Sequence, residues 1–476
     1  MSPRRLQRLS FADTAFLWQG DRGTHAHIGW VMIADGPPPA YADLLKHVKG
    51  RLHLVPRYRQ KLAFPPLQLA LPLWIDDPRF NLEYHVRHAA LPAPGSFDQL
   101  RALVGRIFSQ GLDHSKPLWE LWLVQGLHNR RFAIINKAHR AIVDGIVGVD
   151  ISTVLFDTSL HPAPVPPAER PWLPRPEPSP ADLVTASIRD LVVGAIEVAR
   201  QAWRRVDDPD ATIAAAREVA QGLRELGAAY MRPPAPTPLN VPVGTHRRVY
   251  WTRCRLADFK RIRDICGGTI DDVYLAVVSG ALGAWLRRRG VSTRRLQLRA
   301  DFRISLRTGG SRIVRYFAPL PVGTSEPLQR LRIARRLLDE LKRRRPTLDA
   351  GAIAALRDLT PPALLSRVSR LAFSSRLFNL IAAYVPGPQF PLYLLGHKVV
   401  QVGPVGFLVE RCALMVTLVS YNGMLEFGLV ADADAVPDLD HLGRDIDAAV
   451  AELLEAARRQ KLGGRARKSR RTGAHV

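Results

Sequence analysis

The sequence predicts a mixed α/β (α+β) fold that is divided into two domains. The 476 residues are more than one hydrophobic core ordinarily holds, and 47% of them are hydrophobic, which is enough for two packed interiors. Helix-like and strand-like patterns occur in both halves of the chain. Two proline-rich stretches, 161–180 and 233–242, lie between the halves, and such segments are typical of extended connections.

The first domain is expected at residues 1–160. Ile28–Ala34 is a strand-like run that ends at the turn signal Asp35-Gly36-Pro37, and Ala42–Val55 has helical spacing. Two further strands are predicted at Trp119–Gln125 and Arg131–Lys137. Residues 161–242 then form a proline-rich linker and an alanine-rich helical crossover, Ala181–Tyr230.

The second domain is expected at residues 243–457 and also mixes both element types. Thr269 is a predicted N-cap because Asp272 follows three residues later. Asn422-Gly423, between two apolar runs, predicts a β-hairpin. The other expected elements are a strand at His246–Leu256 and helices at Asp258–Cys266, Val273–Trp285, Ser325–Arg345 and Leu439–Arg459.

Residues 458–476 form a strongly basic tail that is predicted to be disordered. The whole chain carries a net charge of +25, which favours anionic partners such as a membrane surface or phosphate-bearing cofactors. The tail serves either solubility or docking onto anionic lipid. No apolar run is long enough to cross a bilayer, and no apolar signal core follows the N-terminus. We therefore expect a cytoplasmic protein, peripheral to a membrane or lipid droplet.

The cysteines and the composition indicate no metal site and no disulfide framework. Cys254, Cys266 and Cys412 are far apart and lack metal-ligand spacing, so we interpret them as packing residues. No aspartate, glutamate or cysteine clusters in sequence with His139, the histidine discussed next. No cofactor is expected.

The chemical signal of the chain is the segment His139-Arg140-Ala-Ile-Val-Asp144-Gly145, directly after a predicted buried strand. Reactive groups are often found where a strand ends, because the sheet holds them at the edge of a cleft. The segment resembles the HHxxxDG motif of the bacterial wax ester synthase/diacylglycerol O-acyltransferase family, within the CoA-dependent acyltransferase superfamily. Further similar segments follow in the expected order: Leu54-Val-Pro-Arg57, Trp74-Ile-Asp-Asp77, Pro117-Leu-Trp-Glu120, Thr269-Ile-Asp-Asp272, Val385-Pro-Gly-Pro388 and Pro391-Leu-Tyr393.

This resemblance implies two chloramphenicol-acetyltransferase-like domains, with acyl-CoA and an acceptor alcohol meeting in a tunnel between them. The expected activity is transfer of a long-chain acyl group to diacylglycerol or a long-chain alcohol, and the expected partners are these substrates and a membrane surface, with no nucleic acid. In the family, the second histidine is the general base and the aspartate is mainly structural. The resemblance thus assigns the catalytic motif to His139, Arg140, Asp144 and Gly145, and substrate binding to Asp272, Pro386 and Gly387.

The chain departs from the family at several polar positions. Arg140 stands where the general-base histidine is expected, and a guanidinium has no lone pair with which to accept a proton. Asp271 and Tyr384 replace asparagines of two other motifs. A PxSxR-like segment survives only as Arg303-Ile-Ser-Leu-Arg307, and the following GN is absent near Arg315-Tyr316. Apolar and glycine positions of the motifs persist, which indicates a retained fold with a modified or lost site.

Three interpretations follow. The chain is an acyl-CoA-dependent O-acyltransferase in which His139 or a substrate group supplies the base. Alternatively, it is a catalytically impaired paralogue that binds acyl-CoA or neutral lipid, or regulates an active relative. In the third, it is an acyltransferase of another subclass, such as a condensation-type enzyme. Arg140 and Asp144 form an ion pair if their segment is helical.

Several residues also have a purely structural interpretation. Asp144 is structural, Gly145 serves the backbone, and Leu118 and Trp119 pack beneath the site. Asp272 is a helix cap, and Pro386-Gly387 shapes a turn. Four histidines are interpreted as isolated packing residues: His27, His85, His114 and His397.

Overall fold

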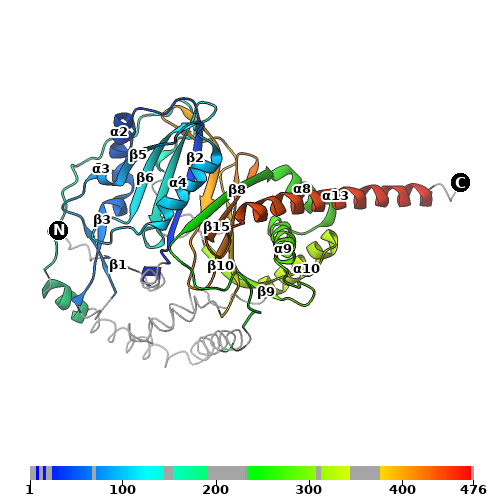
Figure 1. Ribbon diagram of the computed structural model, residues 1–476. Coiled ribbons are helices and arrows are strands. Elements are labelled where there is room, and N and C mark those ends of the chain that lie inside the picture. Colours follow the sequence, from blue (N-terminus) through cyan, green and yellow to red (C-terminus); the bar gives the residue numbers. More distant parts are fainter. Residues whose placement is uncertain are drawn as a thin grey trace, which may run out of the picture.

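A computed structural model describes residues 7–9, 14, 16–17, 24–66, 71–143, 154–179, 181–189, 224, 231, 233–306, 312–343 and 376–472. Two six-stranded sheets lie side by side in it, and helices pack against each (Figure 1). Both sheets contain antiparallel and parallel pairs. The mixed α/β class predicted from the sequence is therefore confirmed, with one large sheet in each half of the fold.

The N-terminal sheet has the strand order β12-β13-β2-β7-β6-β5, and every described pair in it is antiparallel except β5 with β6. The predicted strands are its centre, because β2, β7 and β6 alternate apolar residues between two packed faces. The strand β7 runs two residues beyond its predicted end and includes His139. The strands and helices that the first part of the chain contributes to this sheet and its faces are β2 (His27–Asp35), α2 (Tyr41–Arg51), α3 (Leu82–His85), β5 (Val86–Ala90), α4 (Phe97–Ser109), β6 (Trp119–Leu127) and β7 (Arg131–His139).

A small three-stranded sheet, β1-β4-β3, lies beside this domain. Short 3-10 helices lead into β3 and follow α2. Its strands and these turns are β1 (Gln7–Arg8), η2 (Leu52–Leu54), η3 (Pro56–Arg59), β3 (Gln60–Ala63) and β4 (Leu73–Asp76).

The second half of the chain returns two strands to the N-terminal sheet. β12 (Tyr393–Leu394) and β13 (His397–Val405) extend that sheet because β13 pairs with β2 along its length. The domains predicted from the sequence are consecutive along the chain, so this exchange was not predicted. It joins the domains by main-chain hydrogen bonds as well as by side-chain packing.

The C-terminal sheet has the order β10-β9-β11-β14-β15-β8, with β11 parallel to both of its neighbours. The helix α9 (Ile270–Arg288) packs on it and is buried over most of its length. The remaining elements are β8 (Arg247–Arg255), α8 (Leu256–Cys266), β9 (Leu298–Leu306), β10 (Arg312–Leu320), α10 (Pro327–Arg343), β11 (Leu380–Pro386), β14 (Leu414–Tyr421), β15 (Met424–Asp432) and α13 (Leu439–Thr472).

Local sequence signals account for several of these element boundaries. Thr269 and Asp272 form the predicted capping box of α9. Asn422 and Gly423 both have positive φ and join β14 to β15 as the predicted hairpin. The proline-rich stretch has no helix or strand at 162–179, and residues 181–189 are helical. Most of the predicted helix Ala181–Tyr230 lies outside the described residues.

One prediction about the C-terminus is wrong. The helix α13 continues to Thr472 and projects beyond the body of the protein (Figure 1), although disorder was expected from residue 458. The reason is that its first five turns are anchored on α8, α9 and β8, so the costly nucleation step is already made. Arginine and lysine, which make up eight of residues 458–472, then have favourable helix propensities.

No single helix of the described residues is long and apolar enough to cross a membrane. The helices α8 and α9 meet those criteria only when taken together, and they are bent by 103° at the break between them.

A buried ion cluster stabilises the C-terminal sheet where β9 pairs with β10. Asp301 is fully buried and accepts hydrogen bonds from Arg303 (2.7 Å) and Arg315 (2.7 Å). Burial alone would raise the pKa of Asp301, but the two guanidinium groups outweigh it and the pKa is lowered. Arg303 and Arg315 stand at two of the positions where the chain departs from the family motifs, so these departures meet in one cluster.

Removal of the central carboxylate should therefore destabilise the protein strongly. We expect Asp301→Ala to lower the free energy of unfolding by about 3–5 kcal/mol, because it leaves two buried guanidinium groups without their counter-charge. Urea denaturation measures this change. The control is Glu455→Ala, which breaks the exposed Arg459–Glu455 pair and should cost less than about 1 kcal/mol. Equal effects of the two substitutions would contradict the structural role of Asp301.

Candidate active site

The motif segment begins at the last residue of β7. His139 pairs with His27 of β2, and its main-chain N–H donates to the carbonyl of Leu118 at 2.9 Å. The chain then turns into a short 3-10 helix, η5 (Arg140–Ile142). Leu118 and Trp119 are fully buried beneath this turn, as predicted. Asp144 and Gly145, and therefore the predicted Arg140–Asp144 pair, lie outside the described residues.

His139 is a buried structural residue in this geometry. Its Nδ1 accepts a hydrogen bond from the N–H of Ala141 at 3.1 Å and so caps the η5 turn. In the neutral ring the proton then resides on Nε2, which leaves no nitrogen lone pair for an incoming hydroxyl. Burial, followed by the charges of His114, Arg140 and His25, lowers the pKa of His139 to about 3. The geometry therefore contradicts the hypothesis that His139 replaces the missing base.

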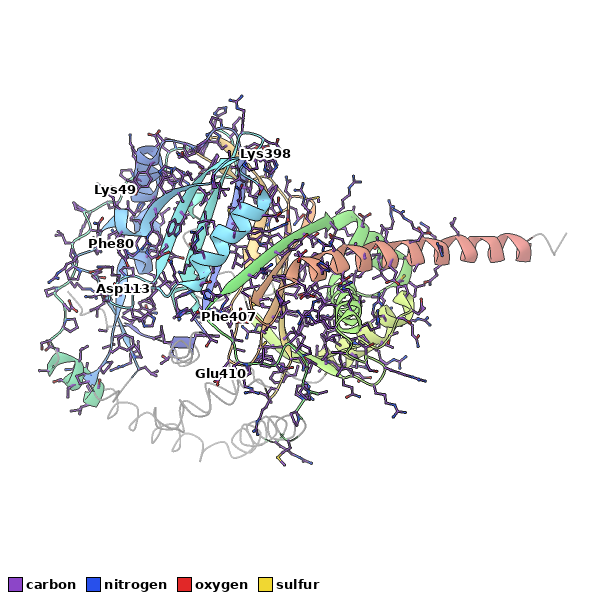
Figure 2. All side chains as sticks on the ribbon, in the orientation of Figure 1. Lys49, Phe80, Asp113, Lys398, Phe407 and Glu410 are labelled. Carbon is purple, nitrogen blue, oxygen red and sulfur yellow. The ribbon has the colours of Figure 1, made fainter. Side chains whose placement is uncertain are left out.

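Arg140 points from the same turn toward the boundary between the domains. Its Nη1 donates to the carbonyl of Val143 at 2.6 Å, and its guanidinium lies over the ring of Phe16 at 5.7 Å. The rings of Phe16 and Phe407 make an edge-to-face contact with their centroids 5.5 Å apart. The guanidinium of Arg303 lies over the Phe407 ring, 5.3 Å from its centroid. Figure 2 shows Phe407 where the two domains meet. Arg140 is thus linked through two aromatic rings to the Asp301 cluster.

Three further histidines surround His139. The ring of His27 lies 6.1 Å from it, His25 stacks on His27 at 5.0 Å, and His114, in the loop before β6, lies 6.1 Å from His139. His27 is buried, and burial lowers its pKa well below the usual value, with Lys137 adding to the effect. The interpretation of His27 and His114 as isolated residues was wrong, and His25 was missed. The two histidines lie just before the predicted strand Ile28–Ala34, and their i, i+2 spacing was the available signal, since extended backbone places such residues on one face.

The other two histidines are packing residues, as predicted. His85 stacks on Trp119 at 4.6 Å, and its Nδ1 lies 2.8 Å from the Trp119 carbonyl oxygen. His397 meets the edge of Phe132 and hydrogen-bonds to the carbonyl of Asp35.

Lys137 gives the histidine group a positively charged neighbour. It is fully buried, and its Nζ donates to the carbonyls of Ile107 (2.8 Å) and Gln110 (2.7 Å), with Glu120 at 3.9 Å. Burial lowers its pKa to about 8. Among the described residues, no group of three histidine, cysteine, aspartate or glutamate side chains is placed to hold a metal ion.

The predicted substrate-binding residues have structural contacts. The Oδ2 of Asp272 accepts hydrogen bonds from the N–H and hydroxyl of Thr269, at 2.6 and 2.9 Å, which confirms the helix-cap interpretation. Gly387 donates its N–H to the hydroxyl of Ser420, and a Cβ at this position would lie 2.2 Å from the Ser420 carbonyl oxygen. Close main-chain approach therefore explains the glycine after Pro386. A role of these residues in substrate binding stays a prediction.

A surface pocket of ≈ 610 Å³ opens beside the histidine group. We call it the β3 pocket. Two of its lining residues, Lys61 and Glu177, form an ion pair at 3.1 Å. The other lining residues are Leu62, Ala63, Phe64, His114, Ser115, Pro178 and Leu183.

Comparisons with known proteins agree with this fold and motif order. Residues 9–274 match the wax ester synthase/diacylglycerol acyltransferase catalytic domain, and residues 309–454 match the C-terminal domain of the same family. The chain is 30% identical over 485 residues to the Mycobacterium tuberculosis protein named "Probable diacyglycerol O-acyltransferase tgs1", covering 98% of this chain and 99% of that one.

Two solved structures are similar over nearly the whole chain. The wax ester synthase/diacylglycerol acyltransferase from Marinobacter aquaeolei VT8 is 25% identical with a TM-score of 0.67, covering 95% of this chain and 100% of that one. The starter condensation domain of rhizomide synthetase RzmA is 14% identical with a TM-score of 0.56, covering 95% and 94%. The latter shows a shared fold only.

The burial of His139 has a measurable consequence for stability. Its pKa is about 3 in the folded protein and near 6.5 when unfolded, so between these values the unfolded chain holds one more proton. Stability therefore falls as pH falls through this range, by about 1.4 kcal/mol per pH unit for this residue. We expect His139→Gln to reduce the slope of unfolding free energy against pH by about one proton between pH 4 and 6. His161→Gln, in the exposed linker, controls for loss of a histidine. An unchanged slope in His139→Gln would mean that the folded protein does not keep this ring neutral.

Proposed function

We propose, from the premise that the chain belongs to the wax ester synthase/diacylglycerol acyltransferase family, that it transfers a long-chain acyl group from acyl-CoA to diacylglycerol or a long-chain alcohol. The catalytic-domain match alone spans more than half of the chain. The near-complete coverage of the similar mycobacterial protein supports the same enzyme class, an acyl-CoA-dependent O-acyltransferase. No cofactor takes part in such a transfer, and acyl-CoA is the co-substrate.

One observation favours a second candidate function. Arg140 occupies the general-base position, and its guanidinium is held by the Val143 carbonyl and the Phe16 ring. A guanidinium does not accept a proton at neutral pH, and general-base assistance typically contributes about 10²–10⁴ in rate. A catalytically impaired paralogue that binds acyl-CoA or neutral lipid is therefore the alternative.

A turnover assay separates the two candidates. The purified protein is given labelled palmitoyl-CoA with dioleoylglycerol or with hexadecanol, and labelled ester is measured after lipid extraction. We expect ester from the wild-type protein with at least one acceptor. Ester formed only by Arg140→His would instead identify the wild-type chain as the impaired paralogue.

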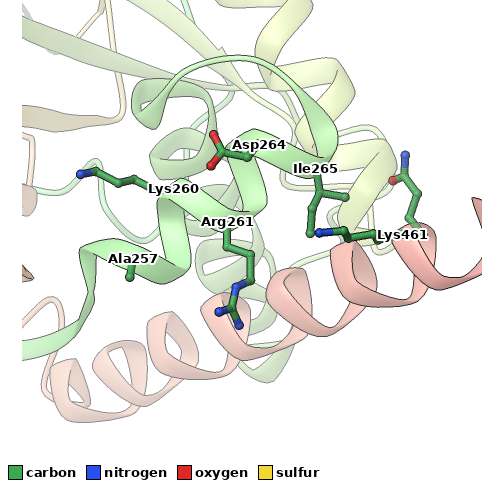
Figure 3. A pocket seen from close by; sticks show the side chains of 7 residues that line it. Ala257, Lys260, Arg261, Asp264, Ile265 and Lys461 are labelled. Carbon is green, nitrogen blue, oxygen red and sulfur yellow. The ribbon is translucent and has the colours of Figure 1, made fainter. Parts of the chain in front are cut away.

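A membrane surface or lipid droplet is the proposed location of this reaction, because both acceptors are water-insoluble. The projecting end of α13 supports docking there. After Glu455 it has no acidic residue, and its basic residues are Arg458, Arg459, Lys461, Arg465, Arg467, Lys468, Arg470 and Arg471. A groove of ≈ 630 Å³ between α8 and α13 is lined by three basic residues, Lys260, Arg261 and Lys461, and by one acidic residue, Asp264 (Figure 3).

Binding to anionic vesicles tests this docking. Each basic residue near an anionic surface contributes about 1 kcal/mol at moderate salt. We expect substitution of Arg467, Lys468 and Arg470 by glutamine to reduce co-sedimentation with phosphatidylserine-containing vesicles at least tenfold. The matched control neutralises three exposed arginines elsewhere: Arg294, Arg295 and Arg336. Equal losses in both variants would show that overall charge, and not α13, determines binding.

A further inference from the structure

The proline-rich stretch between the domains is bound to the surface of the N-terminal domain. Arg175 pairs with Asp76 of β4 at 3.1 Å, and its main-chain N–H donates to the same carboxylate at 3.2 Å. Glu177 pairs with Lys61 of β3 at 3.1 Å. Residues 172–177, which we call the strap, are therefore bound to two strands of the small sheet β1-β4-β3, although the sequence predicts only an extended connection.

Trp172 joins the strap to an aromatic stack inside the domain. The guanidinium of Arg59 lies over its ring, 4.6 Å from the centroid, and Phe80 meets the ring edge to face with the centroids 6.2 Å apart. Phe80, labelled in Figure 2, stacks in turn on the ring of His85 at 5.3 Å. The next residue of the strap, Leu173, is 81% exposed, so the two adjacent side chains have opposite environments.

The stack ends directly beneath the motif turn. His85 is buried and stacks on Trp119 at 4.6 Å, and its Nδ1 hydrogen-bonds to the Trp119 carbonyl at 2.8 Å. Trp119 is opposite Ala138 of β7, and the carbonyl of Leu118 accepts the N–H of His139 at 2.9 Å. Closely packed groups transmit a displacement because little free volume is available to absorb it. The position of the strap is therefore linked to the end of β7.

We propose that Trp172 is a positioning residue for the candidate active site. It fixes the ring of Phe80, and the stack through His85 then fixes the end of β7, from which the motif turn starts. For its effect on turnover this inference rests on the proposed acyltransferase function. The rate of a group transfer depends steeply on the alignment of the reacting groups, so loosening of this turn lowers kcat more than it changes substrate binding.

Substitutions of Trp172 test this role by turnover. We expect Trp172→Ala to lower kcat for ester formation from palmitoyl-CoA and dioleoylglycerol about tenfold, with the KM for palmitoyl-CoA within twofold of the wild-type value. Trp172→Phe should retain at least half of the wild-type kcat, because its ring can still meet the ring of Phe80. Leu173→Ala is the matched control from the same segment and should retain wild-type kcat, since its side chain is exposed.

Amide hydrogen exchange tests the coupling without any turnover. Exchange of the β7 peptide, residues 131–141, is followed by mass spectrometry in the wild-type and variant proteins. We expect Trp172→Ala to raise the exchange rate of its slowest amides at least tenfold, and Leu173→Ala to leave it unchanged. The β15 peptide, residues 424–432, lies in the other large sheet and is the internal reference.

The outcomes separate this inference from the proposed function. A Trp172→Ala variant in which either kcat or exchange of the β7 peptide stays at the wild-type value overturns the positioning role and leaves the acyltransferase function intact. Exchange that rises equally in the β15 peptide also overturns it, because Trp172 would then support the fold as a whole. If the wild-type protein forms no ester, the proposed function fails, and exchange of the β7 peptide still decides whether Trp172 fixes the turn.

Discussion

The hydrogen bond from the Ala141 N–H to the Nδ1 of His139 determines the arrangement of the candidate site. It ends β7 and starts the η5 turn, so residue 140 leaves the sheet at a fixed direction. Because the bond uses the one unprotonated nitrogen of a buried ring, His139 serves the backbone and not the substrate. The pairing of β2 with β7 then places His27 opposite His139, and His25, two residues before β2 begins, stacks on the ring of His27.

Arg140 has consequences that extend beyond the lost base. Its guanidinium lies over Phe16, which contacts Phe407, which in turn contacts Arg303 of the Asp301 cluster. Arg140, Arg303 and Arg315 all stand where the chain departs from the family motifs. These three arginines are connected through one carboxylate and two aromatic rings, so the departures form one interdomain network. Arg140 and Arg303 each lie over a phenylalanine ring, and Arg315 pairs with Asp301.

Much of the fold could be predicted from the sequence because its signals are local. The capping box at Thr269 and Asp272, the hairpin at Asn422-Gly423 and the apolar strand before His139 each depend on a few neighbouring residues. The return of β13 to the N-terminal sheet could not be predicted, because edge pairing between distant segments has no sequence period of its own. The helix beyond residue 457 was missed for a related reason: charge composition indicated disorder, but packing of the preceding turns nucleates the helix.

The site shows the same division between local and distant effects. The motif and the unsuitability of Arg140 as a base follow from the sequence, whereas the ring neighbours of His139 come from β2 and from the loop before β6, 25 or more residues away along the chain. The residues that keep their family identity here, such as Gly387 and Asp272, have contacts that shape the backbone. A close main-chain approach or a helix cap tolerates few substitutes, whereas a proton acceptor needs only an imidazole that reaches the same hydroxyl. Loss of the motif histidine is therefore compatible with an intact fold.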